Sequence, residues 1–243
     1  RAVAEQGAIK SLVDMLSESE ELCLVRAAGA LAELCKDSAS NQDAVRTTAS
    51  GIGKLVNLLT TSAADNVHAE VAAALAVLAD GNAKNQDEIA AVGGIEPLVS
   101  LLKPMDNESD AQLAPSAQTI AAQPSEEGAA ALWALASHHS ANQIAIAAAD
   151  GIARLVAVLG VGSDRAQDQA AGALAALALG NSSNEECIAR LLVELLGSSN
   201  REATAKAARA ISKLARADAS NKRSIAVAGG VELLVSLLAE PLP

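Results

Sequence analysis

The sequence predicts an all-α solenoid, a single elongated domain over residues 1–243 in which copies of one helical unit stack. Apolar residues make up 51% of the chain, yet it has no Phe, no Tyr and one Trp. The core must therefore consist of Ala, Leu, Val and Ile, which suit closely packed helices. Strand patterns of alternating β-branched and aromatic residues are missing. One phrase also recurs about every 42 residues, which is typical of repeat architectures.

Two sets of recurring residues define the register of the repeat. A Leu in an apolar phrase recurs at intervals of 43, 43, 57, 37 and 42 residues, at Leu12, Leu55, Leu98, Leu155, Leu192 and Leu234. An Asn follows a helical Leu by seven residues at Asn41, Asn85, Asn142, Asn184 and Asn221. The two sets agree, so we expect about five units, with incomplete units at both ends.

Each unit is predicted to contain three helices. The first is short and runs from the Asn to a Gly that ends it in the left-handed conformation, at Gly51, Gly94, Gly151 and Gly230. The second, about ten residues long, has apolar residues at helical spacing. The third is longer and rich in Ala; its copies are Val25–Cys35, Val67–Ala79, Glu126–Ala136, Ala166–Ala178 and Ala203–Arg216.

These phrases resemble armadillo repeats over essentially the whole chain. The similarity lies in the Asn-Gln pairs, the phrase Gly-Gly-Ile-Glu-Pro-Leu-Val-Ser-Leu-Leu at 93–102 and the Ala-Leu-Trp-Ala-Leu helix at 131–135. HEAT repeats are the close alternative, and the short first helix broken by Gly favours armadillo. The resemblance implies a right-handed superhelix whose third helices line a concave groove.

Two units depart from the pattern. The 57-residue unit carries about fifteen extra residues between its second and third helices, which predicts a flexible insertion loop at about 104–125. The 37-residue unit lacks about five residues after Asn184, including the Gly. We expect its first helix to run almost directly into residues 191–196. Neither end of the chain resembles a polar cap, so self-association through the ends is a further expectation.

Charge and cysteine content narrow the function classes. The formal net charge is −11, which argues against nucleic acid and anionic membrane surfaces as partners. Residues 201–243 are the exception, with seven basic and four acidic side chains. Three cysteines form no metal-like cluster and favour reduced thiols in an intracellular, cytoplasmic or nuclear, protein.

No pattern in the sequence indicates an enzyme, a cofactor or a metal site. His138 and His139 have no ligand-type neighbours at metal-binding spacing, so we interpret them as a solvated loop pair. Glu126 and Glu127 are expected to favour the positive end of the helix that follows them. Binding therefore deserves more weight than catalysis.

The armadillo resemblance suggests where a partner would bind. In family members that hold extended peptides, the third helix carries a Trp and, four residues on, an Asn. The Trp position here is Ala32, Ala76, Trp133, Ala175 and Ser212, and the Asn position is Lys36, Asp80, Ser137, Leu179 and Arg216. One Trp is present and no Asn, so a regular ladder that reads basic peptides is not expected. Trp133 is interpreted as facing the groove, with a buried packing role as the alternative.

A basic surface is predicted on the last third helix. Lys206, Arg209, Lys213 and Arg216 step by three, four and three residues, which places them on one helical face. The function we predict is a non-enzymatic scaffold that binds a protein or peptide segment, acidic where it meets this face. The residues expected to line the groove are Lys36, Asp80, Trp133, Ser137, Lys206, Arg209, Ser212, Lys213 and Arg216. The alternatives are an assembly domain that packs through its ends and a small-ligand-sensing armadillo domain.

Overall fold

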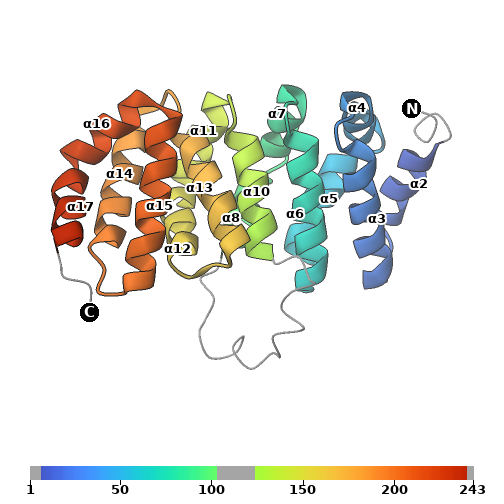
Figure 1. The fold of residues 1–243 in the computed structure, drawn as a ribbon. Helices are drawn as coiled ribbons and strands as arrows, with labels where there is room; N and C mark the ends of the chain where they lie inside the picture. Colours follow the sequence, from blue (N-terminus) through green and yellow to red (C-terminus); the bar gives the residue numbers. More distant parts are fainter. Residues whose placement is uncertain (1–6, 103–123, 240–243) are drawn as a thin grey trace.

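The computed structural model of the chain describes residues 7–102 and 124–239, and all regular structure within these ranges is α-helical (Figure 1). The helices follow one another in an elongated stack, with the N-terminal unit at one end and the C-terminal unit at the other. The fold is an armadillo-type solenoid, as predicted. The insertion loop expected at about 104–125 lies outside the described residues, apart from Pro124 and Ser125, which begin a helix.

Three classes of helix recur along the stack, as the repeat predicts. The first helices are α4 (Ala39–Thr47), α7 (Ala83–Ala91), α11 (Ser140–Ala148) and α16 (Ala219–Val227). The second helices are α2 (Ala8–Met15), α5 (Gly51–Thr61), α8 (Ile95–Ser100), α12 (Gly151–Val161) and α17 (Gly230–Ala239). The third helices are α3 (Glu21–Cys35), α6 (Asp65–Ala79), α10 (Pro124–Ala136), α13 (Asp164–Ala178) and α15 (Arg201–Ala217). Each third helix begins two to four residues before the predicted start.

Leu and Ala from the third helices form much of the core, together with Ile, Leu and Val from the first and second helices. Leu31, Leu75, Leu132 and Leu174 occupy one position of the repeat and are each fully buried. Burying one such side chain contributes about 1.5–3 kcal/mol. Ala and Gly elsewhere on these helices let α3, α6, α10 and α13 pack side by side in sequence order.

The side chain of each recurring Asn donates a hydrogen bond to a carbonyl group at the C-terminal end of the third helix that precedes it. The last four carbonyl groups of a helix have no partner within the helix. The amide nitrogen of Asn142 donates to Leu135 O in α10 at 3.1 Å and to Gln86 O at 3.4 Å. Asn85 makes the equivalent bonds to Leu78 O and Gln42 O. At Asn85, Asn142 and Asn184 the side chain therefore ties its unit to the one before it.

The Gln that follows each Asn binds the end of the third helix that comes after it. Gln86 Nε2 donates to Ala134 O at 2.7 Å and to Ser137 O at 3.2 Å, at the end of α10. Gln42 and Gln143 make matching bonds to the ends of α6 and α13. Together the buried amides form a series of hydrogen bonds that we call the amide relay.

The recurring glycines have a different role from the predicted one. Gly51, Gly94, Gly151 and Gly230 were expected to end helices in the left-handed conformation, and this prediction is wrong. The residue before each of them takes that conformation, with φ of 55° at Ser50, 80° at Gly93, 65° at Asp150 and 86° at Gly229. The recurring glycine instead allows a close approach. A Cβ on Gly151 would lie 2.7 Å from Ile146 O.

The shortened unit joins two helices that were expected to follow each other almost directly. Its first and second helices form one helix, α14 (Ser182–Leu196). α13 and α15, the third helices on either side, contact each other less than the other neighbouring pairs do. In this unit Glu185 takes the place of the Gln. Its carboxylate cannot donate a hydrogen bond to the next third helix, and it instead accepts one from Ser220 Oγ at 2.9 Å. The amide relay is therefore interrupted in this unit.

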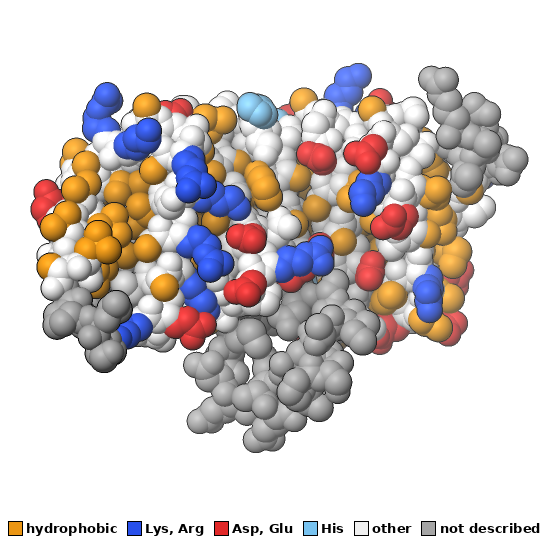
Figure 2. All heavy atoms as spheres, viewed as in Figure 1, with side chains coloured by type: hydrophobic (Ala, Val, Ile, Leu, Met, Phe, Trp, Pro, Cys, Tyr) orange, Lys and Arg blue, Asp and Glu red, His pale blue; other side chains and the backbone are white. Residues whose placement is uncertain are grey.

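The C-terminal helix presents an exposed apolar face. Val231, Val235 and Leu238 of α17 are 50%, 61% and 86% exposed. The equivalent side chains of α5 and α12 are buried against their third helices. Figure 2 shows this apolar surface beside α16 and α17. Self-association through the ends stays a prediction.

Candidate functional site

The five third helices stand next to one another on one side of the molecule, and their exposed residues form what we call the third-helix face (Figure 1). The predicted groove residues all lie on or directly after these helices. Lys36 and Asp80 follow α3 and α6 as C-caps, and Trp133 and Ser137 lie at the end of α10. Lys206, Arg209, Ser212, Lys213 and Arg216 belong to α15.

Trp133 combines exposure with tight packing. Its side chain is 39% exposed, and its ring lies against α13, where a Cβ on Gly172 would come within 2.6 Å of the ring. Lys213 Nζ lies 5.5 Å from the ring centroid, within the range of a cation–π interaction. The same ammonium group donates to Asp168 O at 2.9 Å. Trp133 thus joins three neighbouring third helices, and one part of its ring remains open to a partner.

The basic face of α15 is divided into two pairs of residues. Lys206 Nζ contacts Glu202 Oε1 at 2.8 Å and its side chain is only 15% exposed, while Lys213 is held by Asp168 and Trp133. Arg209 and Arg216 are exposed and make no hydrogen bond or ion pair with another described residue. Because two of the four cations already have partners, Arg209 and Arg216 are the ones available to bind an anionic group.

The remaining predicted groove residues differ in their exposure to solvent. Lys36, Asp80 and Ser212 are exposed. Ser137 is half-buried, and its hydroxyl donates to Trp133 O at 2.8 Å within the same helix. Leu179, in the Asn position of its unit, is 38% exposed and follows α13. The face therefore places an exposed Leu and the Trp in neighbouring units.

A buried acidic group on the same face was not anticipated. Glu126 and Glu127 in the first turn of α10 are each 7% exposed. Arg165 of α13 reaches across to Glu126 Oε1 at 2.9 Å and to Glu127 Oε1 at 3.6 Å. Desolvation raises the pKa of Glu127, Arg165 partly opposes this, and Glu126 and Glu70 add to the rise. The helix N-terminus was expected to attract these residues, but the ion pairs with Arg165 lay beyond local sequence patterns.

Because the pKa of Glu127 is raised, we expect the substitution Glu127→Gln to increase the stability of the fold at neutral pH. The folded protein binds this proton more tightly than the unfolded chain does. The stability that the carboxyl contributes is therefore complete below its ordinary pKa and is lost as pH rises through the raised value. Denaturation of Glu127→Gln should show a higher free energy of unfolding than wild type at pH 7, with the difference closing near pH 4.

Glu202→Gln serves as the opposite control for this prediction. A hydrogen bond from Lys206 lowers the pKa of Glu202, so its contribution is present at neutral pH and is lost as pH falls. That variant should lose stability at pH 7 and match wild type in acid. A loss for Glu127→Gln at pH 7 would show that Arg165 outweighs desolvation.

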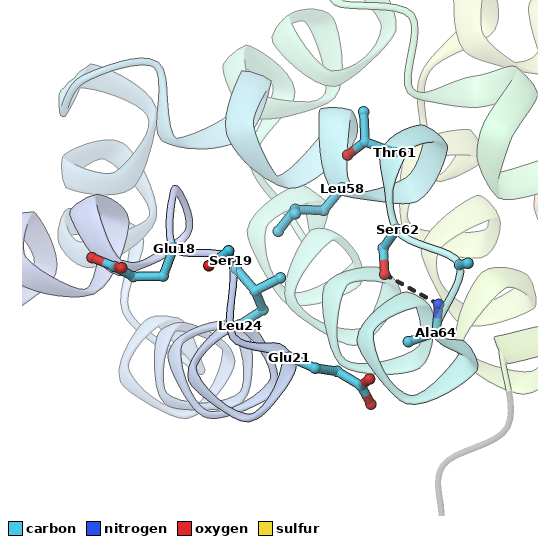
Figure 3. A pocket seen from close by; sticks show the side chains of 9 residues that line it. Glu18, Ser19, Glu21, Leu24, Leu58, Thr61, Ser62 and Ala64 are labelled. Carbon is cyan, nitrogen blue, oxygen red and sulfur yellow. Dashed lines mark hydrogen bonds between the residues drawn. The ribbon is translucent and has the colours of Figure 1, made fainter.

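A cavity of about 570 Å³ lies away from the predicted residues, between the first two units (Figure 3). Glu18 and Glu21 line it near the start of α3, and Leu58, Thr61 and Ser62 line it at the end of α5. Ser62 Oγ accepts from Ala64 N at 3.2 Å, which closes the turn at its edge. No sequence prediction placed a site there.

His139 differs from its predicted role. It was interpreted as part of a solvated loop pair, but its Nδ1 accepts from Asn142 N and its Nε2 lies 3.0 Å from Asp87 Oδ1. It therefore caps α11 and contacts the preceding unit, and only His138 is exposed. In the described ranges, no group of three or more His, Cys, Asp or Glu is placed to hold a metal ion. Burial raises the pKa of Cys35 to about 12, which makes it a poor nucleophile.

None of the helices described in residues 7–102 and 124–239 is by itself long and apolar enough to cross a membrane. α11 and α12 together reach the required length and composition, but they bend by 75° where they meet.

Solved structures provide the comparison with known proteins. An engineered protein is 33% identical, with a TM-score of 0.72 over 97% of this chain and 90% of its own. A designed armadillo repeat protein is 22% identical, with a TM-score of 0.68 over 96% of this chain and 93% of its own. Another, with the same identity, coverage and TM-score, was solved in complex with the peptide (KR)4. No protein-family model and no curated protein matches the sequence.

Proposed function

We propose that this chain, an armadillo-type repeat protein, is a scaffold that holds an extended segment of a partner protein along its third-helix face. The observation that carries the proposal is Trp133, which is 39% exposed although α13 and Lys213 hold its ring in place. A fixed aromatic side chain offers a large contact area at little cost in conformational entropy, and such residues often dominate binding energy. No reaction follows binding in this proposal.

The segment over α15 is acidic in this proposal. Arg209 and Arg216 are exposed there without partners among the described residues. Figure 2 shows mostly Lys and Arg side chains over α15, whereas both signs mix over α3, α6, α10 and α13. Because the whole chain has a net charge of −11, an acidic segment would be repelled by most of the surface and attracted to exposed basic side chains such as Arg209 and Arg216. The charge distribution thus favours one end of the face over the other.

Trp133 offers a direct test, since it is the only Trp and the chain has no Tyr or Phe. Titration with an acidic peptide of about 12 residues, the length that spans five helices packed about 10 Å apart, should change its fluorescence. A basic peptide of the same length should cause less change at the same concentration. Added salt should lower the affinity for the acidic peptide, because the attraction is between exposed charges that salt screens.

Two charge reversals locate the contact. The substitution Arg216→Glu on α15 should weaken binding of the acidic peptide at least tenfold, which corresponds to about 1.4 kcal/mol. Arg190→Glu changes the net charge equally but lies on α14, outside the third-helix face, and should leave affinity within twofold. Equal losses for both variants would mean that net charge alone governs binding. An unchanged Trp signal with every peptide would refute the proposal.

A further inference from the structure

Charged residues at two positions of the repeat follow the same order along the third-helix face, although Glu127 and Lys206 at the second position are already paired within the chain. The first position is the residue after each third helix, or at its last turn: Lys36, Asp80, Ser137, Leu179 and Arg216. The second is six residues before the Trp position: Arg26, Glu70, Glu127, Gln169 and Lys206. Both run positive on α3, negative on α6, without net positive charge on α10 and α13, and positive on α15.

The contacts within the face sharpen this order. Glu70 leans over α3, where a Cβ on Gly29 would lie 2.9 Å from its Oε2, so the carboxylate stands at the junction of α3 and α6. Arg165 already pairs with Glu126 and Glu127 on α10. Asp80 is exposed and makes no side-chain hydrogen bond or ion pair with another described residue. At the position after each third helix, the acidic group that is open to a partner therefore belongs to α6.

An apolar stretch lies between the acidic and the basic positions. Trp133 and Leu179, from α10 and the end of α13, are 39% and 38% exposed. Ala130 and Ala175 beside them are half-buried and carry no polar group. At the ends of the third helices, from α3 to α15, the face is thus positive, negative, apolar and positive. Exposed charges of both signs lie nearer the start of α13, at Asp164, Arg165 and Asp168.

We infer that the partner is a segment with the complementary order: an acidic residue, a basic residue, an apolar anchor and an acidic pair. This inference rests on the proposed function and names the chemistry of its ligand. Third helices lie about 10 Å apart and an extended chain rises about 3.3 Å per residue, so successive groups fall about three residues apart. The acidic pair, two helices beyond the Trp, follows the apolar anchor by about six residues.

This order excludes two simpler ligands. A uniformly acidic segment would meet Glu70 and Asp80 on α6 and be repelled there. A uniformly basic segment would meet Arg209 and Arg216 on α15. Like charges placed together cost affinity, so both ligands bind more weakly than the ordered one.

The test compares three peptides of one composition by Trp133 fluorescence. The ordered peptide carries the four groups at the intervals given above, in both chain directions as two separate peptides. The scrambled peptide exchanges the Lys with one residue of the acidic pair. We expect one direction of the ordered peptide to bind at least tenfold more tightly than the scrambled peptide.

Exchanging the charges of Asp80 and of the Lys in the peptide then tests whether this Lys binds at α6. Asp80→Lys should weaken the ordered peptide at least fivefold and restore affinity for a version in which Glu replaces the Lys. Glu88→Lys makes the same change on α7, outside the third-helix face, and should have no such effect. Recovery that is specific to Asp80 identifies the pair, because only directly interacting groups deviate from additivity in this way.

The outcomes separate this inference from the proposed function. Equal binding of ordered and scrambled peptides, with a Trp133 response to both, overturns the inference and leaves the proposed function intact. No response to any peptide overturns both. An equal effect of Asp80→Lys and Glu88→Lys also overturns the inference.

Discussion

Replacing Gln86 with Glu is expected to destabilise the fold by about 3–5 kcal/mol at pH 7. Gln86 is 4% exposed, and its amide nitrogen is the donor for Ala134 O and Ser137 O at the end of α10. A carboxylate has no proton to donate, so its charge would be buried beside two carbonyl oxygens. Ala141 stands where Ser220 supports Glu185 in the later unit, and it supplies no hydroxyl.

The variant Gln86→Met separates two causes of the stability loss: the missing hydrogen-bond donor and the added buried charge. This side chain has a similar shape and no charge, so it should cost only the unpaired carbonyl groups, about 1–3 kcal/mol. Urea denaturation of the two variants at pH 7 measures the difference. As pH falls, the introduced carboxyl takes up a proton and can donate again, so Gln86→Glu should regain stability while Gln86→Met should not. Equal losses at pH 7 would show that the site admits water.

Gly151→Ala is expected to cost about 2–3 kcal/mol, which lowers the melting temperature by roughly 5–10 °C. An added Cβ would lie 2.7 Å from Ile146 O and 2.6 Å from Ile146 Cγ2. Neither atom is at the end of a flexible side chain, so the corner between α11 and α12 must open. Thermal unfolding followed by circular dichroism measures the loss.

Gly53→Ala is the matched control, two residues into the equivalent helix α5. The nearest atom to its added Cβ is Ser50 Cβ at 3.7 Å, an ordinary contact. Replacing a helical Gly by Ala there should stabilise the protein by about 0.5–1 kcal/mol. If Gly151→Ala were also stabilising, close approach would not be the reason for the recurring glycine.

The sequence was sufficient to predict the repeat, the three classes of helix and the close succession of the two helices that the structure joins in α14. These depend on spacing along the chain, which a sequence shows directly. The role of the glycines could not be obtained in this way. A Gly after a short helix is equally consistent with a left-handed residue and with a missing Cβ, and only the position of Ile146 O distinguishes them.

The candidate site was predictable in position and less so in detail. The armadillo register placed Trp133, Asp80 and Arg216 on the third-helix face. The pairing of Lys206 with Glu202 was foreseeable, because they are four residues apart on one helix. The contact of Trp133 with Gly172 and the reach of Arg165 to Glu126 join different units. Such contacts depend on how units stack, which local patterns do not encode.

The interruption of the amide relay at Glu185 has a consequence for how the molecule unfolds. The stability of a stacked repeat array is approximately a sum of terms for each unit and each junction between neighbours. Upstream of α14, buried amides couple every junction, whereas Asn221 donates only to Leu214 O and Glu185 donates to no carbonyl. The weakest coupling therefore lies ahead of α15. The most accessible partly unfolded form is one in which α15, α16 and α17 fray while the earlier units stay folded, so the helix that carries Arg209 and Arg216 is also the first to lose cooperativity with the rest.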